Sequence, residues 1–182
     1  DRLRQLSVDT KMILIFGAPI QSNEKLYIGA FILKPDHSIS IYTKQYLHSG
    51  EEEFFDSSFD FNPLIILNNE QISLAICADI VNPKHPENAN QNNSTIYIAS
   101  IFFTPNGITD AHKTLGDYSK QYKMSVLMSN YCGQSWGLES GGQSAFWDMN
   151  GDLIVTMDKT DSGLLIVENA NNKWIGKTLN YE

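Results

Sequence analysis

Three residues of the sequence could together attack a carbonyl group, and each lies in a suggestive local setting. Cys77 ends an apolar run, Ile72 to Ile76, that predicts a buried strand, and open α/β folds place chemistry at such strand ends. Lys44 follows another predicted strand, and Glu51 opens an acidic run that precedes two phenylalanines. A thiolate can attack the carbonyl carbon, an ammonium group can stabilise the thiolate and the oxyanion, and a carboxylate can carry the proton.

Each of these residues also has an ordinary structural explanation when it is taken alone. A free cysteine is most often a small buried apolar residue, a lysine at a strand end is most often solvated, and an acidic run is most often surface. The four histidines are scattered, and their spacing suggests no partner for any of them. The functional interpretation therefore depends on whether the fold supports a combined role.

The elements that must position these residues are predicted from apolar runs, from alternation and from turn residues. The first strand is expected to be fully buried and to be ended by Gly17 and Pro19, and residues 46–61 are expected to form a loop with one helical turn. Hairpins are expected to join 26–33 with 38–43 across a turn that contains Pro35, 65–67 with 72–76, and 143–149 with 152–157. Residues 133–142 are expected to form a glycine-rich loop. The residues after 168 are expected to be a polar tail. Helices are expected at 1–9, 85–93 and 109–123, and strands at 12–16, 26–33, 38–43, 65–67, 72–76, 95–103, 125–129, 143–149, 152–157 and 163–168. This pattern indicates an α/β or α+β fold whose sheets are covered by helices and by a second sheet.

Composition narrows the class of protein. With 182 residues, 42% of them hydrophobic, the chain is expected to form a single domain over 1–182. A net charge of −8 argues against a nucleic-acid partner, and the lack of an apolar run near 18 residues argues against a membrane span. The two cysteines, Cys77 and Cys132, have neither metal-site spacing nor a disulfide framework, which favours a reducing, cytoplasmic setting.

Four motifs, in the expected order, resemble those of the nitrilase superfamily of carbon–nitrogen hydrolases. Tyr42 to Leu47 is similar to the lysine motif of that family, and Glu51 to Phe55 is similar to its second-glutamate motif. Ala75 to Asp79, followed by Pro83, is similar to the nucleophile motif, and Gly142 to Gly151 is similar to a late hairpin motif. The resemblance covers residues 12 to about 167, and it is the order of four individually weak motifs that makes it specific.

The resemblance implies an α-β-β-α sandwich and a Glu-Lys-Cys triad that hydrolyses amides through a thioester. Carried over, Cys77 is the nucleophile, and Lys44 together with the backbone N–H of Ala78 holds the oxyanion. Glu51 corresponds to the second glutamate, which positions the lysine and the substrate. No metal and no organic cofactor is implied, because a thiolate and a lysine suffice for the chemistry.

The resemblance also indicates which substrate class to expect. Phe103 and Thr104, at a strand end, are expected near the substrate pocket. Ala78 follows the cysteine where true nitrilases have a Trp-Glu pair, so amides are favoured over nitriles. Lys84 stands where the family often has a glutamate, which affects the local substrate contacts.

One family element has no match in the sequence, the first glutamate, which is the general base and precedes the strand expected at 12–16. Asp1 and Asp9 both lack its surroundings. Either the chain is a fragment that lacks the first strands and helices of the sandwich, or the protein has lost its base. The helix-like start favours the fragment, which could by itself be inactive.

The sequence therefore predicts a cysteine-dependent amidohydrolase that acts on a small-molecule amide. Two alternatives stay open at this point: a non-catalytic binding or assembly module on the same fold, and an acyltransferase that uses the same thioester. Apolar surface left by a partial sandwich predicts a homo-oligomer.

Overall fold

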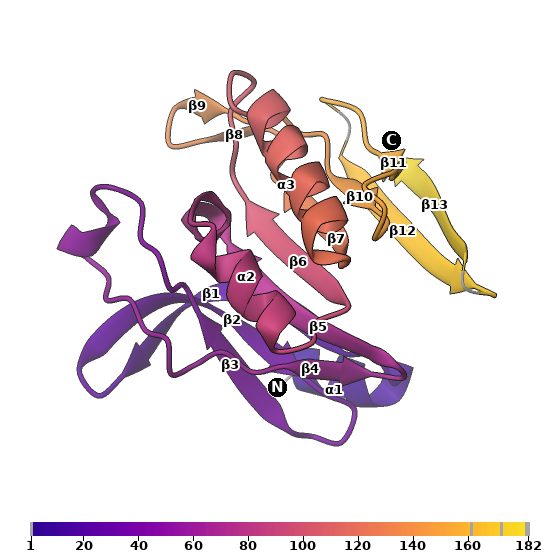
Figure 1. Cartoon of the computed structure of the whole chain (residues 1–182). Helices are drawn as coiled ribbons and strands as arrows, with labels where there is room; N and C mark the ends of the chain where they lie inside the picture. Colours follow the sequence, from indigo (N-terminus) through magenta and orange to yellow (C-terminus); the bar gives the residue numbers. More distant parts are fainter. Residues whose placement is uncertain (1, 161, 172, 181–182) are drawn as a thin grey trace. The chain divides into compact units, whose positions relative to one another are not determined.

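The computed structural model describes residues 2–160, 162–171 and 173–180, and it divides into two compact units, Asp1–Pro63 and Leu64–Glu182 (Figure 1). Each unit contains its own main sheet, with three strands in the first unit and six in the second. The single domain over 1–182 stays a prediction. Asp1 lies outside the described residues. Among those residues, no helix is long and apolar enough to cross a membrane.

The first unit is one helix and an antiparallel sheet in the order β1-β2-β3 (Figure 1). The expected helix at the start of the chain, the hairpin between the second and third strands, and the helical turn in the following loop are confirmed. The turn between β2 and β3 contains His37 in the left-handed conformation (φ 68°). The elements are α1 (Arg2–Thr10), β1 (Leu14–Ser22), β2 (Lys25–Leu33), β3 (Ile39–Thr43) and the 3₁₀ turn η1 (Glu51–Glu53).

The first strand differs from the prediction, because neither Gly17 nor Pro19 ends it. β1 continues to Ser22 and stays paired with β2 throughout, with Pro19 opposite Ile28. β1 is an edge strand of its sheet, and an edge strand tolerates proline because its outward N–H groups need no partner in the sheet. The strand was also expected to be fully buried, but its burial alternates and Ile15 is exposed.

The second unit is a six-stranded mixed sheet in the order β11-β10-β7-β6-β5-β4, with helices α2 and α3 on one face (Figure 1). Side chains of β6, β7 and β10 pack under α3, where Tyr97, Leu115 and Val126 are fully buried. The expected hairpins and both helices of this unit are confirmed. The elements are β4 (Ile65–Leu67), β5 (Glu70–Ile76), α2 (Lys84–Gln91), β6 (Ile96–Ile101), α3 (Ile108–Tyr122), β7 (Ser125–Asn130), β10 (Ala145–Trp147) and β11 (Leu153–Thr156).

Three parallel strands of this sheet set the position of Cys77. β5, β6 and β7 pair in parallel, with Ile76 opposite Ser100 and Ser100 opposite Ser129. Crossovers through α2 and α3 return the chain to the same side, as parallel strands require. The carboxyl ends of the strands therefore share one edge of the sheet, where Cys77 follows β5 and Phe103 follows β6 closely.

The end of the chain also differs from the prediction, since the expected polar tail forms a further strand. β12 (Gly163–Ala170) and β13 (Lys173–Asn180) make an antiparallel hairpin. Trp174 packs against Phe146 of β10 with ring centroids 4.8 Å apart, and Gly176 lies so close to Val155 that a Cβ there would clash. β13 contains few apolar residues, and for this reason its composition predicted a polar tail and not a strand. The glycine-rich loop before β10 likewise contains a small hairpin, β8 (Gln134–Ser135) and β9 (Leu138–Glu139).

Candidate functional site

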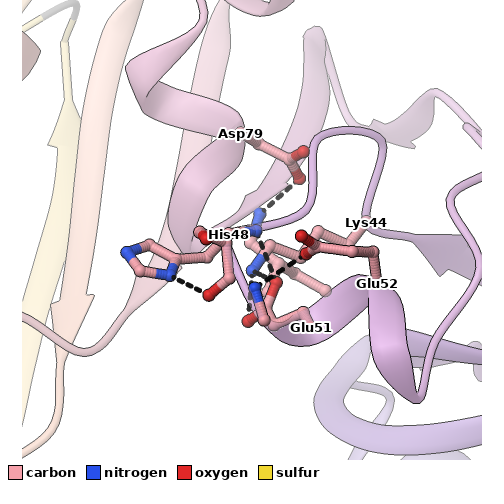
Figure 2. A network of polar contacts seen from close by, with 8 residues as sticks. Lys44, His48, Glu51, Glu52 and Asp79 are labelled. Carbon is pink, nitrogen blue, oxygen red and sulfur yellow. Dashed lines mark hydrogen bonds and ion pairs between the residues drawn. The ribbon is translucent and has the colours of Figure 1, made fainter.

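Lys44 and Glu51 form a close ion pair in the first unit (Figure 2). The Lys44 Nζ atom donates to both carboxylate oxygens of Glu51, at 2.8 and 2.6 Å. Lys44 follows β3 directly, and its backbone N–H donates to the Ile28 carbonyl at 2.8 Å. Only 1% of the lysine side chain is exposed, against 26% for the glutamate. A cation this deeply buried needs a counterion, and Glu51 supplies one.

The η1 turn explains why Glu51 points at the lysine. Gly50 precedes it at φ 94°, a conformation that glycine adopts without strain. The Glu51 Oε2 atom accepts the His48 backbone N–H at 2.7 Å, and Glu52 turns back to accept the N–H of Gly50 at 2.8 Å (Figure 2). Both oxygens of Glu51 are thus engaged by donors. This arrangement suits a carboxylate that orients an ammonium group.

Cys77 lies at the point where β5 ends and the 3₁₀ turn η2 (Cys77–Val81) begins in the second unit. Its backbone has φ 47°, which is uncommon for a residue with a side chain and is a feature of strained, functional turns. The thiol is free, and the residue is half-buried. Ala78 is the next residue of the same turn. A sharp strand-to-turn corner of this kind presents a nucleophile at a sheet edge.

Phe103 and Thr104 follow β6 at the same edge of the sheet, in a segment fixed by its backbone. The Phe103 N–H donates to the Asn130 side-chain oxygen at 2.9 Å, and the Phe103 carbonyl accepts from Gly141 at 2.7 Å. The Thr104 carbonyl accepts the N–H of Ile108 at 3.1 Å, which starts α3. These hydrogen bonds hold the segment against β7 and the start of α3.

A buried polar chain behind Cys77 escaped the sequence analysis. The Asp79 carboxylate accepts the Ile76 N–H at 2.8 Å and lies 3.9 Å from the Nε2 atom of His85. The Nδ1 atom of His85 lies 2.7 Å from the Tyr97 hydroxyl. Burial lowers the pKa of His85, and the nearby Asp79 opposes that shift. The spacing of His85 suggested no partner because its contacts reach a turn and a strand that are separate in the sequence.

Two cavities of the second unit are lined by described residues outside the Cys77 turn. One of about 430 Å³ lies at the ends of β6 and β7 and is lined by Asn130, Cys132, Gln143 and Ser144 among others. The Cys132 thiol there points to the Thr160 carbonyl, with a sulfur–oxygen distance of 3.1 Å. Cys77 is not among the lining residues of this cavity.

Taken by unit, the structure brings Lys44 and Glu51 together, and it places Cys77, Ala78, Phe103 and Thr104 along one edge of the second sheet. The first group is an oriented cation, which can stabilise a thiolate or an oxyanion. The second group presents a thiol on a strained turn beside a fixed loop. The first group can therefore stabilise negative charge, and the second presents a thiol that can attack a carbonyl carbon.

Comparison with known proteins gives one family and several structural neighbours. A family model described as carbon–nitrogen hydrolase matches residues 1–174. A search of curated protein sequences found no match. Among solved structures, an amidase from Nesterenkonia sp. AN1 is similar with a TM-score of 0.76 and 20% identity, over 87% of this chain and 64% of the amidase chain. Another structure of that amidase, a mutant, shows acrylamide added to its active-site cysteine.

Two further neighbours have the same fold. A carbon–nitrogen hydrolase from Helicobacter pylori G27 has a TM-score of 0.78 and 15% identity, over 88% of this chain and 62% of its own. A glutamine-dependent NAD+ synthetase from Acinetobacter baumannii has a TM-score of 0.85 and 17% identity, over 96% of this chain and 35% of its own. The chain thus spans less than two thirds of the length of these neighbours. Its mixed α/β fold is theirs, which confirms the predicted fold class.

Proposed function

Because the chain belongs to the carbon–nitrogen hydrolase family, we propose that its protein cleaves the carbon–nitrogen bond of a small amide through a thioester on Cys77. The observation that carries the proposal is the backbone of Cys77, which takes φ 47° at the carboxyl end of a central strand. A left-handed backbone at a non-glycine residue costs on the order of 1–3 kcal/mol, so the surrounding structure has to hold the Cys77 turn in place. The buried Lys44–Glu51 pair supports the same chemistry, because it supplies an oriented cation.

In the proposed reaction the Cys77 thiolate attacks the amide carbonyl carbon, and a C–S bond forms. The negative charge that develops on the carbonyl oxygen is stabilised by the Lys44 ammonium group and the Ala78 backbone N–H. The proton that the thiol gave up is held by a carboxylate base. It passes to the nitrogen as the C–N bond breaks, the amine leaves, and a thioester remains. Water hydrolyses the thioester to a carboxylic acid and restores the thiol.

Glu51 has a positioning role in this scheme. Its two oxygens are occupied by the Lys44 ammonium group and by the His48 N–H, so it fixes the cation. A different carboxylate, the first glutamate of the family pattern, would transfer the protons. No residue before Met12 in this sequence corresponds to that glutamate. Phe103 and Thr104 are proposed to contact the substrate. Self-association and a cytoplasmic setting stay predictions.

The proposal is tested by ammonia release from a panel of short aliphatic amides, with Cys77→Ala and Cys132→Ala compared with the unaltered protein. Both cysteines are half-buried and free, so the second variant is a matched control. We expect Cys77→Ala to abolish release and Cys132→Ala to retain it. Equal release by Cys77→Ala would contradict the assignment. Added hydroxylamine separates hydrolysis from acyl transfer, since a transferase would favour its own acceptor over water.

A further inference from the structure

A chain of three buried polar side chains begins in the Cys77 turn (Ile76 to Asp79) and continues through His85 to Tyr97. Asp79 and Tyr97 are fully buried, and His85 is 3% exposed. All three belong to the second unit, and they come from η2, α2 and β6. Buried polar groups in folded proteins are nearly always paired, and the partners of these three side chains link them to one another and to the Cys77 turn.

The first link ties Asp79 to the start of the turn. Its Oδ2 atom accepts the N–H of Ile76 at 2.8 Å, which is the peptide group directly before the Cys77 residue. The Asp79 carbonyl accepts the N–H of Asn82 at 3.3 Å, which closes the far side of η2. The carboxylate thus bridges back across Cys77, whose φ of 47° needs support from its surroundings.

The second link places His85 between Asp79 and Tyr97. The Nε2 atom of His85 lies 3.9 Å from Asp79 Oδ2, an electrostatic contact that is too long for a hydrogen bond. Its Nδ1 atom lies 2.7 Å from the Tyr97 hydroxyl, which is a hydrogen bond. Burial raises the pKa of Tyr97 well above 10, so the phenol keeps its proton. A hydroxyl that donates to Nδ1 leaves the ring proton of a neutral imidazole on Nε2, facing the carboxylate.

We propose that His85 is a positioning residue for Cys77: Tyr97 fixes its ring and tautomer, its Nε2–H faces the Asp79 carboxylate, and that carboxylate holds the Ile76 peptide at the start of the Cys77 turn. The importance of this chain for catalysis rests on the proposed function of Cys77. The effect of His85 on the geometry of the Cys77 turn is independent of that function.

Two variants of His85 separate positioning from packing. Glutamine places a polar group near the position of Nε2, and asparagine places one near the position of Nδ1. We expect His85→Asn to speed hydrogen exchange at the Ile76 amide by about tenfold, measured by NMR, because the acceptor of that N–H loses its contact with His85. In the same variant, iodoacetamide should alkylate Cys77 about tenfold more slowly than in the unaltered protein, with the rate at Cys132 of the same molecule as the internal reference.

The conservative variant supplies the rescue. His85→Gln should stay within about threefold of the unaltered protein in both measurements, because it keeps a donor toward Asp79. His37→Asn, at an exposed turn position, is the control and should change neither. The proposal is overturned if His85→Asn changes neither quantity, or if glutamine is no better than asparagine.

A further variant keeps the test decisive if His85→Asn does not fold. Tyr97→Phe retains the ring and removes only the hydroxyl, so it should shift both readouts in the direction of His85→Asn, and unchanged values would overturn the proposal. Failure of the proposed function looks different. In that case Cys77 of the unaltered protein would react no faster than Cys132, while exchange at the Ile76 amide would still report on the chain behind it.

Discussion

Replacing Glu51 with glutamine tests whether the Lys44–Glu51 pair holds a buried charge. Glutamine has nearly the same shape as glutamate, so the substitution removes one negative charge and little volume. The Lys44 side chain is 1% exposed and contacts both carboxylate oxygens, so the substitution leaves a buried amino group without its carboxylate partner. Breaking a buried pair from one side costs about 3–5 kcal/mol, and the 26% exposure of Glu51 favours the lower end, about 3 kcal/mol.

The assay is equilibrium unfolding in urea, read as the free energy of unfolding. Glu52→Gln is the matched control, because Glu52 lies on the same turn and is exposed, with one bond to the Gly50 N–H. Its cost should be about 0.5 kcal/mol or less.

A double-mutant cycle gives the sharper result. Lys44→Met removes the buried charge itself, so adding Glu51→Gln to it should cost about 1 kcal/mol or less, well below the cost in the presence of Lys44. If Glu51→Gln destabilises the protein no more than Glu52→Gln does, or if the two effects simply add, the lysine is not a buried cation that depends on Glu51.

Two further predictions concern stability. Burial lowers the pKa of His85 from its ordinary value of 6.5, so below that pH the unfolded chain binds more protons than the folded one, and stability should fall until the folded pKa is passed. This loss, measured as melting temperature against pH, should be smaller in His85→Leu and unchanged in His37→Asn. If the melting temperatures of both variants fell equally with pH, His85 would not be the source of the loss. A Cβ at Gly29 would lie 2.6 Å from the Tyr42 carbonyl oxygen, so Gly29→Ala should cost about 2 kcal/mol. Gly17→Ala, with 3.8 Å to its nearest atom, should cost clearly less, and similar melting temperatures would count against this packing.

Local patterns were sufficient where the sequence determines structure over short distances. The apolar run before Cys77 predicted β5, and the proline-containing turn predicted the β2–β3 hairpin that leads to Lys44. The short separation of Lys44 and Glu51 allows one turn to join them. These features depend on neighbours in the sequence, so the sequence alone could indicate them.

Features that depend on distant partners were missed. Pro19 ends a strand only if the strand is central, and the position of β1 at a sheet edge is a property of the whole sheet. The strand β13 depends on the packing of Trp174 against Phe146, a residue of β10 that is distant in the sequence. His85 found its partner in Tyr97 through the packing of α2 on the sheet. Contacts of this kind are decided by tertiary packing, and local spacing carries no signal for them.

The measurement that tests the central claim most directly is the alkylation rate of each cysteine by iodoacetamide, followed by peptide mass spectrometry. Cys77 and Cys132 are both free and half-buried, so exposure alone gives no reason for a large difference. A nucleophile on an activated turn should react at least about tenfold faster than an ordinary thiol at neutral pH. Equal rates, or faster reaction at Cys132, would contradict the account of Cys77 as the catalytic nucleophile.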